Sequence, residues 1–379
     1  MSTRIQSRRI LTPDGVRAGY VYLDGGRIAD VTDAARPCDT MVDVGDDYVS
    51  PGFIDLHVHG GAGHDFAGTV DDVIAGVQFH LSHGTTSICP TVSAAPFPVM
   101  AQAAARIGCA KRSGRARANI LGAHLEGPFL AKEYKGAMPE YLLREGDENL
   151  LRAYQNKYPG VIRYITVSPE VPDVVEMIGK ISHDVVVAIG HSGADYDTSM
   201  EAIRRGARCV THTFNAMRLF HQHQPAIMGA ALESDCWCEA ICDGRHLHPG
   251  TVRMLLKCKG WDKVIAITDS IMAAGLPDGN YKLGVNDVVV KDGDAVLASN
   301  GVRAGSTLTL AQALRNIVAF TDRSVQDVIP LMTANPAKAL RMDDRKGSIE
   351  VGKDADMVLL DDELNVVTTV GLGRVIYTA

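Results

Sequence analysis

The sequence predicts an α/β protein in which eight strands close into a barrel and both chain ends contribute to a separate small β domain. Between residues 51 and 345, short apolar segments alternate for the most part with segments of helical periodicity. This alternation is typical of a parallel sheet covered by helices, and eight repeats predict a (β/α)8 barrel of the TIM type. The competing architecture is a doubly wound open sheet, but no glycine-rich phosphate turn opens a first βα unit here.

Both ends of the chain have the composition of short strands joined by tight turns. Val21–Val31 predicts a hairpin, because its Asp-Gly-Gly turn supplies residues that tolerate positive φ. Gly347–Leu360 and Val366–Tyr377 carry similar β-type residues interrupted by Gly and Asp. Neither end has enough apolar surface for a stable core of its own. We therefore expect residues 1–50 and 346–379 to pair into one small β domain.

The barrel domain is expected to span residues 51–345. Several of its strand candidates are continuous apolar runs, as expected for strands covered on both faces. After the eighth strand, the segment Asp287–Ala298 has a turn between two apolar runs and predicts an inserted hairpin. The strand candidates are Phe53–His59, Thr86–Val92, Asn119–Glu126, Val161–Pro169, Val185–Ser192, Cys209–Met217, Cys238–Asp243 and Val264–Ser270. The helix candidates are Asp71–Ser82, Phe97–Arg112, Val174–Ile181, Asp197–Arg205 and Pro249–Lys259.

The composition is that of an ordinary globular protein. Of the 379 residues, 46% are hydrophobic and 22% are charged, which excludes a disordered or fibrous chain. The net charge is 38 minus 45, or −7, so we expect no binding to nucleic acid or to an acidic membrane surface. The N-terminus lacks an apolar signal-peptide core, and no apolar run is long enough to span a membrane. Eight cysteines in so long a chain predict reduced thiols and a cytoplasmic location.

Five of the eight predicted strands end in a metal-competent residue, at the end where barrel enzymes place their active sites. His57 and His59 end the first strand, and residues two apart on a strand face the same side. Imidazoles and carboxylates in this number suit Zn²⁺ or another borderline divalent metal. The other strand ends carry Glu126, His191, His212 and Asp269.

Each of these residues has an ordinary structural explanation when it is taken alone. A histidine pair often hydrogen-bonds only within its loop, Asp269 alone can cap a helix, and Glu126 alone can be a surface charge. Because five strands carry such a residue at the same end, coincidence is a poor explanation, and we prefer the metal site. His124 is expected to face the opposite side from Glu126, in packing or behind a ligand.

The ordered set of motifs resembles the N-acetylglucosamine-6-phosphate deacetylases of the amidohydrolase superfamily, over nearly the whole chain. The resemblance implies a metal-dependent (β/α)8 barrel with a small β domain, and a homodimer. The motifs that carry it are Pro51–His59, His124–Pro128, Gly190–Ser192, Thr211–Met217, Asp243–His246 and Thr268-Asp269.

The resemblance also implies roles for individual residues. Glu126, His191 and His212 match the ligands of a shared metal site, and the His57/His59 pair matches the histidines that some members use for a second metal. One or two ions are therefore expected, with Glu126 as a candidate bridge. Asp269 matches the catalytic aspartate, which takes a proton from water and returns it to the leaving amine, and His246 matches a histidine near the amide carbonyl.

Two departures from the family pattern bear on the substrate. Met138 stands where members commonly have a histidine that touches the sugar, and a thioether is only a weak acceptor. His223 stands where an arginine usually helps to hold the 6-phosphate, and neutral histidine does not replace its fork of donors. Arg245 is a candidate replacement, although a surface ion pair explains it equally well, and Arg218 is another. Asn215 and the backbone of Ala216 match positions in the phosphate pocket.

The sequence therefore predicts a hydrolase that removes the acetyl group from an N-acetylated amino sugar, with N-acetylglucosamine 6-phosphate as the first candidate substrate. Other N-acyl amino sugars, phosphorylated or not, and other small N-acyl compounds stay open. A barrel deaminase is the alternative enzyme class, although His191 is not followed by the glutamate that such enzymes carry. A scaffold without catalysis is a further alternative. Zn, Fe, Co and Mn all suit the predicted ligands.

Overall fold

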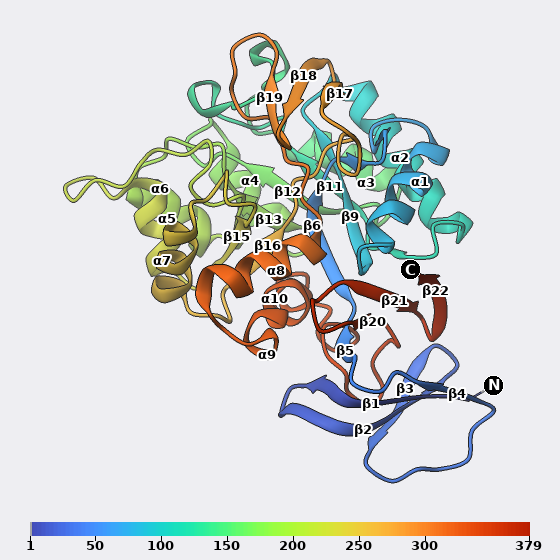
Figure 1. Cartoon of the computed structure of the whole chain (residues 1–379). Helices are drawn as coiled ribbons and strands as arrows, with labels where there is room; N and C mark the ends of the chain where they lie inside the picture. Colours follow the sequence, from blue (N-terminus) through green and yellow to red (C-terminus); the bar gives the residue numbers. More distant parts are fainter. Residues whose placement is uncertain (1) are drawn as a thin grey trace.

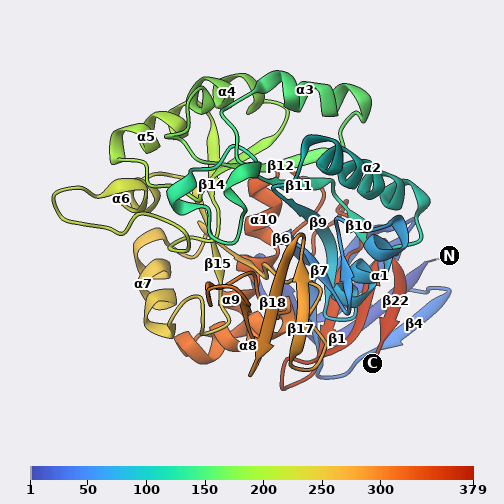
Figure 2. The ribbon, with the colours of Figure 1, turned by 90° about the horizontal axis from the view of Figure 1, so that it is seen from above.

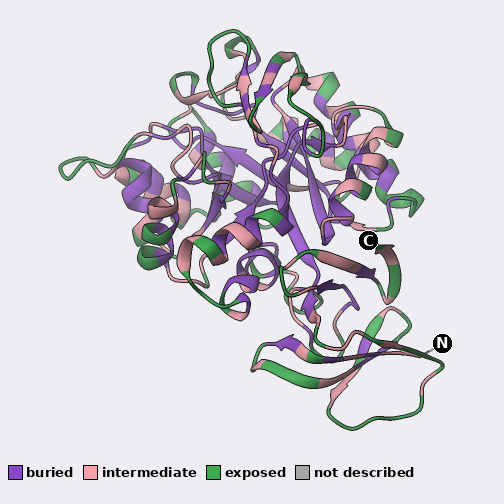
Figure 3. Ribbon diagram, viewed as in Figure 1, coloured by how far each residue is buried: buried purple, intermediate pink, exposed green. Residues whose placement is uncertain are grey.

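The computed structural model describes residues 2–379 and confirms the predicted fold class. Eight parallel strands form a nearly closed barrel, and a mixed sheet built from both chain ends lies beside it (Figure 1). The barrel strands are buried along their length, whereas the small sheet carries many intermediate and exposed residues (Figure 3). In the described residues 2–379, no helix is both long and apolar enough to cross a membrane.

The small sheet has the strand order β22-β21-β20-β5-β1-β2-β3, with β4 paired to β1. The antiparallel pairing of β5 with β20 joins the two chain ends, with Pro51 opposite Met357. Its N-terminal strands are β1 Thr3–Thr12, β2 Gly15–Asp24, β3 Arg27–Thr32, β4 Thr40–Asp43 and β5 Tyr48–Pro51. Its C-terminal strands are β20 Met357–Leu360, β21 Val366–Gly371 and β22 Arg374–Thr378.

The barrel strands follow one another in chain order. Strands β6 and β16 close the circle through backbone hydrogen bonds, in which Asp269 N donates to His57 O at 2.8 Å and His59 N donates to Ser270 O at 2.7 Å. The strands are β6 Phe53–Val58, β9 Thr85–Ser93, β10 Asn119–Ile120 with β11 Ala123–Glu126, β12 Ile162–Val167, β13 Val186–Ile189, β14 Ala207–Val210, β15 Trp237–Ile241 and β16 Val264–Ile267.

Helices surround the barrel when it is seen from above (Figure 2). The predicted helices are present as α1 Val70–Leu81, α2 Phe97–Ser113, α4 Val174–Ile181, α5 Tyr196–Arg204 and α7 Pro249–Lys259. The structure adds helices that the sequence analysis did not identify: α3 Glu148–Lys157, α6 Ala226–Glu233, α8 Leu310–Thr321, α9 Val325–Val328 and α10 Ala334–Ala339. Helix α6 is apolar on nearly every side, so it has no polar face that would reveal its period.

The insertion after the eighth strand is a three-stranded antiparallel sheet that begins before Asp287. Its strands are β17 Gly279–Leu283, β18 Asn286–Lys291 and β19 Asp294–Leu297. Its buried residues, among them Val288 and Leu297, pack against Ile271 and Ala273 from the segment after β16. Asn286 Nδ2 donates to the carbonyl of Ala137 at 2.9 Å, which joins this sheet to the loop after β11. The insertion thus lies over the end of the barrel that carries the predicted site.

A buried ion network joins the small sheet to the barrel. The ammonium of Lys346 lies 3.0 Å from Asp354 and 2.6 Å from Asp356, and all three residues are buried. Asp356 also accepts a hydrogen bond of 3.1 Å from Asn119 Nδ2 on β10. Because each carboxylate has a partner, the network holds the two parts together without an unpaired buried charge.

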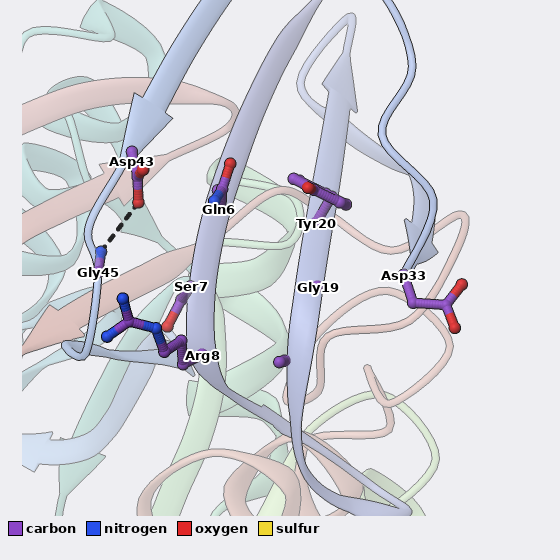
Figure 4. A pocket seen from close by; sticks show the side chains of 9 residues that line it. Gln6, Ser7, Arg8, Gly19, Tyr20, Asp33, Asp43 and Gly45 are labelled. Atoms are coloured by element: carbon purple, nitrogen blue, oxygen red, sulfur yellow. Dashed lines mark hydrogen bonds between the residues drawn. The ribbon is translucent and has the colours of Figure 1, made fainter.

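The small sheet carries a shallow hollow of about 280 Å³ away from the barrel (Figure 4). Gln6, Ser7 and Arg8 of β1 lie beside Gly19 and Tyr20 of β2 in this hollow. None of the residues that the sequence assigns to the chemistry lines it.

Candidate active site

The residues predicted to bind metal converge at the C-terminal ends of the barrel strands. Each of two groups places three ligand atoms within 4.8 Å of one another, and every member is buried. This convergence requires a closed barrel, because the residues come from strands on opposite sides of it. The groups are His57, His59 and Asp269, and Glu126, His191 and His212.

Glu126 lies between the two groups. Its Oε1 is 3.2 Å from Nε2 of His57, 3.2 Å from Nε2 of His191 and 3.3 Å from Nε2 of His212. Its Oε2 is 3.3 Å from Nε2 of His59. One carboxylate thus faces all four imidazoles, which is the arrangement expected of a bridging ligand.

Three of these residues stand just beyond their strands, in a left-handed backbone conformation. His191, His212 and Asp269 have φ values of 49°, 27° and 51°, and each follows the last residue of its strand by two positions. Positive φ is unfavourable for residues with a Cβ, and such strain accumulates at functional sites. The sequence analysis expected these residues inside their strands. In the structure, the sharp turn after each strand places the side chains over the barrel mouth.

Hydrogen bonds at Nδ1 orient two of the imidazoles. Nδ1 of His191 donates to the carbonyl of Tyr134 at 2.9 Å, so its Nε2 carries the lone pair that faces Glu126. Nδ1 of His59 lies 3.1 Å from Oγ of Ser93. Partners of this kind fix ring orientation and tautomer in metal sites.

Glu239 on β15 orients His57, and the sequence analysis missed it. Its Oε2 lies 3.2 Å from His57 Nδ1 and accepts a 3.0 Å hydrogen bond from the backbone N of His212. Its Oε1 accepts a 2.6 Å hydrogen bond from the hydroxyl of Tyr164. The available signal was a lone acidic residue within an otherwise apolar strand, because such a residue is rarely buried without partners.

The electrostatics of the site are those of buried carboxylates facing imidazoles. Burial lowers the pKa of His57 and His59, but the nearby Glu126 and Asp269 outweigh it. The pKa of His59 rises to about 9, and that of His57 lies well above its ordinary value. Burial raises the pKa of Glu126 and Asp269, but the imidazoles outweigh it and lower both, that of Glu126 strongly. Both carboxylates are therefore ionised at neutral pH.

The donor set fits a divalent cation. Among the described residues 2–379, the buried atom His57 Nε2 has no hydrogen-bond partner, and the Nε2 atoms of His191 and His212 lie 3.0 Å apart beside Glu126. Two buried carboxylates need positive charge nearby, and four imidazoles supply nitrogen ligands of the kind that Zn²⁺ and its neighbours prefer. Ring nitrogens that face ionised carboxylates without a hydrogen-bond partner are typical of a metal site.

A cavity of about 350 Å³ opens directly above these groups. Its wall includes Met138, Asn215, Ala216 and His246, four residues that the sequence analysis expected to contact substrate. The catalytic candidate Asp269 also lines it. The predicted substrate contacts on these segments therefore face the same space as the chemistry.

Two predicted substrate contacts lie elsewhere. Neither His223 nor Arg245 is among the residues that line this cavity. His223 is exposed on the loop before α6, which projects away from the barrel (Figure 1). Arg245 is exposed, and its guanidinium donates to the carbonyl of Asp292 at the β18–β19 turn. Their contact with substrate stays a prediction.

Arg303 lines the cavity, and the sequence analysis did not single it out. It follows β19, and it is the only arginine or lysine among the lining residues within the described chain. Its guanidinium forms a fork with Asp294, with Nε to Oδ1 at 2.8 Å and Nη2 to Oδ2 at 2.9 Å. An arginine held in this way offers its remaining donors to an anionic group of a ligand.

The expectation that His124 faces the opposite side from Glu126 was wrong. His124 and Glu126 are two residues apart on β11, so the pleat places both side chains on the same face. The His124 ring lies inside the barrel, with its centroid 4.6 Å from that of His57. Its Nδ1 and Nε2 lie 3.1 Å and 2.9 Å from the hydroxyls of Thr91 and Thr166. It packs beneath the centre and supports the ring of His57.

Comparisons with known proteins agree with this geometry. Residues 48–376 match the amidohydrolase family. The chain is 35% identical to the N-acetylglucosamine-6-phosphate deacetylase of Bacillus subtilis, over 96% of this chain and 93% of that protein. It is 34% identical to the N-acetylgalactosamine-6-phosphate deacetylase of Escherichia coli O157:H7, over 97% of each.

A solved structure shows the same architecture. It is a variant of the N-acetyl-D-glucosamine-6-phosphate deacetylase of Mycobacterium smegmatis in complex with N-acetyl-D-glucosamine-6-phosphate. It superimposes with a TM-score of 0.94 at 30% identity, with each chain fully covered. The chain belongs to the amidohydrolase family, and within it to the group whose members include the N-acetylglucosamine-6-phosphate deacetylases.

Proposed function

We propose that this amidohydrolase removes the acetyl group from N-acetylglucosamine 6-phosphate in a metal-dependent hydrolysis. The observation that carries the proposal is the convergence of four imidazoles, Glu126 and Asp269 at the barrel mouth, where all of them except the fully buried His57 line one cavity. The relatives named for this reaction cover nearly the whole chain. A scaffold protein would have no need to keep six buried ligand candidates, and the relatives are deacetylases rather than deaminases.

The side chains divide the hydrolysis between them. A bound divalent cation lowers the pKa of water and stabilises negative charge on the carbonyl oxygen. Asp269 is ionised, because the imidazoles beside it lower its pKa, and it accepts a proton from the attacking water. Water adds to the amide carbonyl, the C–N bond breaks, and Asp269 delivers the proton to the departing nitrogen. The products are acetate and the free amino sugar phosphate.

His246 contacts the substrate from the wall of the cavity. Its Nδ1 lies 2.7 Å from Oδ2 of Asp243, which also accepts at Oδ1 from the His246 backbone N at 2.7 Å. The ring is thereby held on Asp243, and Nε2 is the nitrogen left for the substrate. Nε2 then faces the carbonyl oxygen or a neighbouring hydroxyl of the substrate.

The anionic group of the substrate meets Asn215 and the backbone of Ala216 on one wall and Arg303 on another. Asn215 Nδ2 bonds to the carbonyls of His212 and Thr213 at 3.2 and 3.3 Å, which ties this wall to a ligand. Because Arg303 is the lining residue with permanent positive charge, it supports a phosphorylated over an unphosphorylated sugar.

A second substrate is favoured by Met138. Its side chain is buried in a small apolar cluster with Ala94, Leu130 and Leu142, and it presents no strong hydrogen-bonding group to the cavity. Such a wall discriminates weakly between sugar epimers, because only a positioned donor or acceptor rejects a misplaced hydroxyl strongly. N-acetylgalactosamine 6-phosphate is therefore the second candidate.

The proposal extends to the identity of the metal and to the oligomeric state. Zn²⁺ is the first candidate ion, and one or two ions are bound. A homodimer is supported by the family resemblance and by Leu219 and Phe220, which are exposed on the loop before α6. A cytoplasmic location is supported by eight cysteines without a disulfide. Light scattering after gel filtration measures the mass of the assembly.

An acetate-release screen tests the function. The purified chain is assayed against the 6-phosphates of N-acetylglucosamine and N-acetylgalactosamine and against both unphosphorylated sugars, with metal quantified in the same preparation. We expect acetate from a phosphorylated sugar and at least one tightly bound divalent ion per chain. Ammonia without acetate would support a deaminase, and a metal-free chain without turnover would support a scaffold.

A further inference from the structure

Glu239 is a fully buried carboxylate beneath the candidate metal centre, and the proposed reaction does not use it. It lies on β15 among apolar neighbours and has no exposed surface. An ionised carboxylate in such a place is strongly unfavourable unless several donors satisfy it. A carboxylate inside an apolar strand therefore requires hydrogen-bond donors around it.

Three donors satisfy the Glu239 carboxylate, and two of them belong to the metal centre. Oε2 accepts from the Nδ1–H of His57 at 3.2 Å and from the backbone N–H of His212 at 3.0 Å. Oε1 accepts from the hydroxyl of Tyr164 at 2.6 Å. Because both oxygens are held, the carboxylate cannot rotate away from His57. Glu239 thus joins the ring of one ligand group to the backbone of the other.

The contact with His57 decides which ring nitrogen is available as a ligand. A neutral imidazole carries one N–H, and a carboxylate at Nδ1 holds the proton there. The lone pair then sits on Nε2, which lies 3.2 Å from Glu126 Oε1 and 3.4 Å from Asp269 Oδ1. The opposite tautomer would place a proton where an ion has to bind.

No other imidazole of the centre has a partner of this strength in the described chain. Nδ1 of His59 lies beside the neutral hydroxyl of Ser93, and Nδ1 of His191 lies beside the carbonyl of Tyr134. Nδ1 of His212 has no hydrogen-bond partner in residues 2–379. A carboxylate behind an imidazole makes the ring a stronger ligand than a neutral acceptor does.

We propose that Glu239 is a positioning residue that selects the Nδ1–H form of His57 and so allows a second ion to bind at His57, His59 and Asp269. This inference rests on the proposed metal-dependent function. The ion at Glu126, His191 and His212 depends on Glu239 only through the backbone of His212. Loss of Glu239 therefore weakens the second ion much more than the first.

The test compares Glu239→Leu and Glu239→Gln with wild type by metal titration. The metal-free chains are titrated with Zn²⁺ against a competing chelator, and ions per chain are counted by mass spectrometry. We expect two ions in wild type, with the weaker step lowered about 10- to 100-fold in Glu239→Leu. Glu239→Gln keeps an acceptor oxygen and should lose less. Glu233→Leu is the matched control, because Glu233 accepts a 2.6 Å hydrogen bond from Tyr196 on the surface.

A second measurement reports the tautomer directly. In metal-free protein with ¹⁵N-labelled histidine, at a pH above the raised pKa of His57, the neutral ring should carry its proton on Nδ1 in wild type and be a mixture of both tautomers in Glu239→Leu. If Glu239→Leu does not fold, Tyr164→Phe serves instead, because it frees Oε1 and should lower the affinity for the second ion by a smaller factor. His57→Asn removes a ligand of the second ion and serves as the reference in which only the first ion binds.

The outcomes separate this inference from the proposed function. Two ions bound with wild-type affinities in Glu239→Leu would overturn the positioning role and leave the deacetylase proposal intact. A wild-type chain that deacetylates with a single ion would also overturn it. A wild-type chain without tightly bound metal and without turnover would overturn both.

Discussion

Replacing Asp269 with asparagine tests the proposed chemistry most directly. The change keeps the volume of the side chain and removes its charge, so the side chain can no longer accept a proton and becomes a weaker ligand in the group of His57, His59 and Asp269. In wild type, the imidazoles of His57 and His59, at 3.4 and 3.2 Å from Oδ1, lower the pKa of Asp269. The base is therefore in its active form in nearly every molecule at neutral pH, and the substitution removes its whole contribution.

The expected loss in kcat is the contribution of a general base, about 10²- to 10⁴-fold, or about 3 to 5 kcal/mol of activation free energy. KM should change little, because Asn has the shape of Asp and the cavity keeps its form. The assay is acetate release under saturating substrate, with metal content measured for each preparation. Asp262→Asn is the matched control, since Asp262 is exposed beside β16 and outside the cavity. A variant that keeps its metal and more than a tenth of wild-type kcat would refute the assignment.

Four further outcomes are expected. A chelator should abolish acetate release, and added Zn²⁺ should restore it; turnover that survives complete metal removal contradicts the mechanism. Arg303→Ala should raise KM about tenfold or more for a phosphorylated sugar with little change for its unphosphorylated form, whereas equal effects on both would exclude a phosphate contact. Lys346→Met removes the cation shared by Asp354 and Asp356; Asp354 keeps Arg27 and Arg345 as partners, so Asp356 is the buried carboxylate left without a cation. The change should cost about 3 kcal/mol, or about 4 °C in Tm at about 2.1 cal/mol/K for each of 379 residues, while exposed Lys338→Met should not shift the melting curve. Burial lowers the pKa of His80 from 6.5 to about 4, so an unfolded chain binds this proton first and stability falls as the pH drops below 6.5. His80→Gln places an amide N–H near the position of Nε2, which keeps a donor for the carbonyl of Gly60. This variant should lose about 2 kcal/mol less than wild type between about pH 7.5 and pH 5 in urea unfolding; equal losses contradict the shift.

The fold class and the ligand candidates could be predicted because they depend on local order along the chain. Apolar strands recur between helices, and the spacing of His57 and His59 places two imidazoles on one face wherever that strand lies. Helix α6 was not predicted, because it is apolar on almost every side and so shows no helical periodicity. Helix α3 was also missed, although its buried residues Leu151 and Tyr154 stand three apart.

The details of the site depend on contacts between distant residues. The strands β13 and β14 end at Ile189 and Val210, three and seven residues before the predicted ends at Ser192 and Met217, and positive φ at His191 and His212 turns these side chains over the barrel mouth. Apolar pattern alone does not report such a turn, because the conformation is held by surrounding structure.

The sequence alone determined which side chains are available for the chemistry and at which end of the barrel they lie. Only the tertiary structure decided which of them meet. Glu239 contacts residues 27, 75 and 182 positions away, and Arg303 rather than Arg245 lines the cavity. Side-chain type and periodicity are properties of short segments, whereas a hydrogen bond to a distant residue exists only once the barrel has closed and the insertion has folded over its mouth.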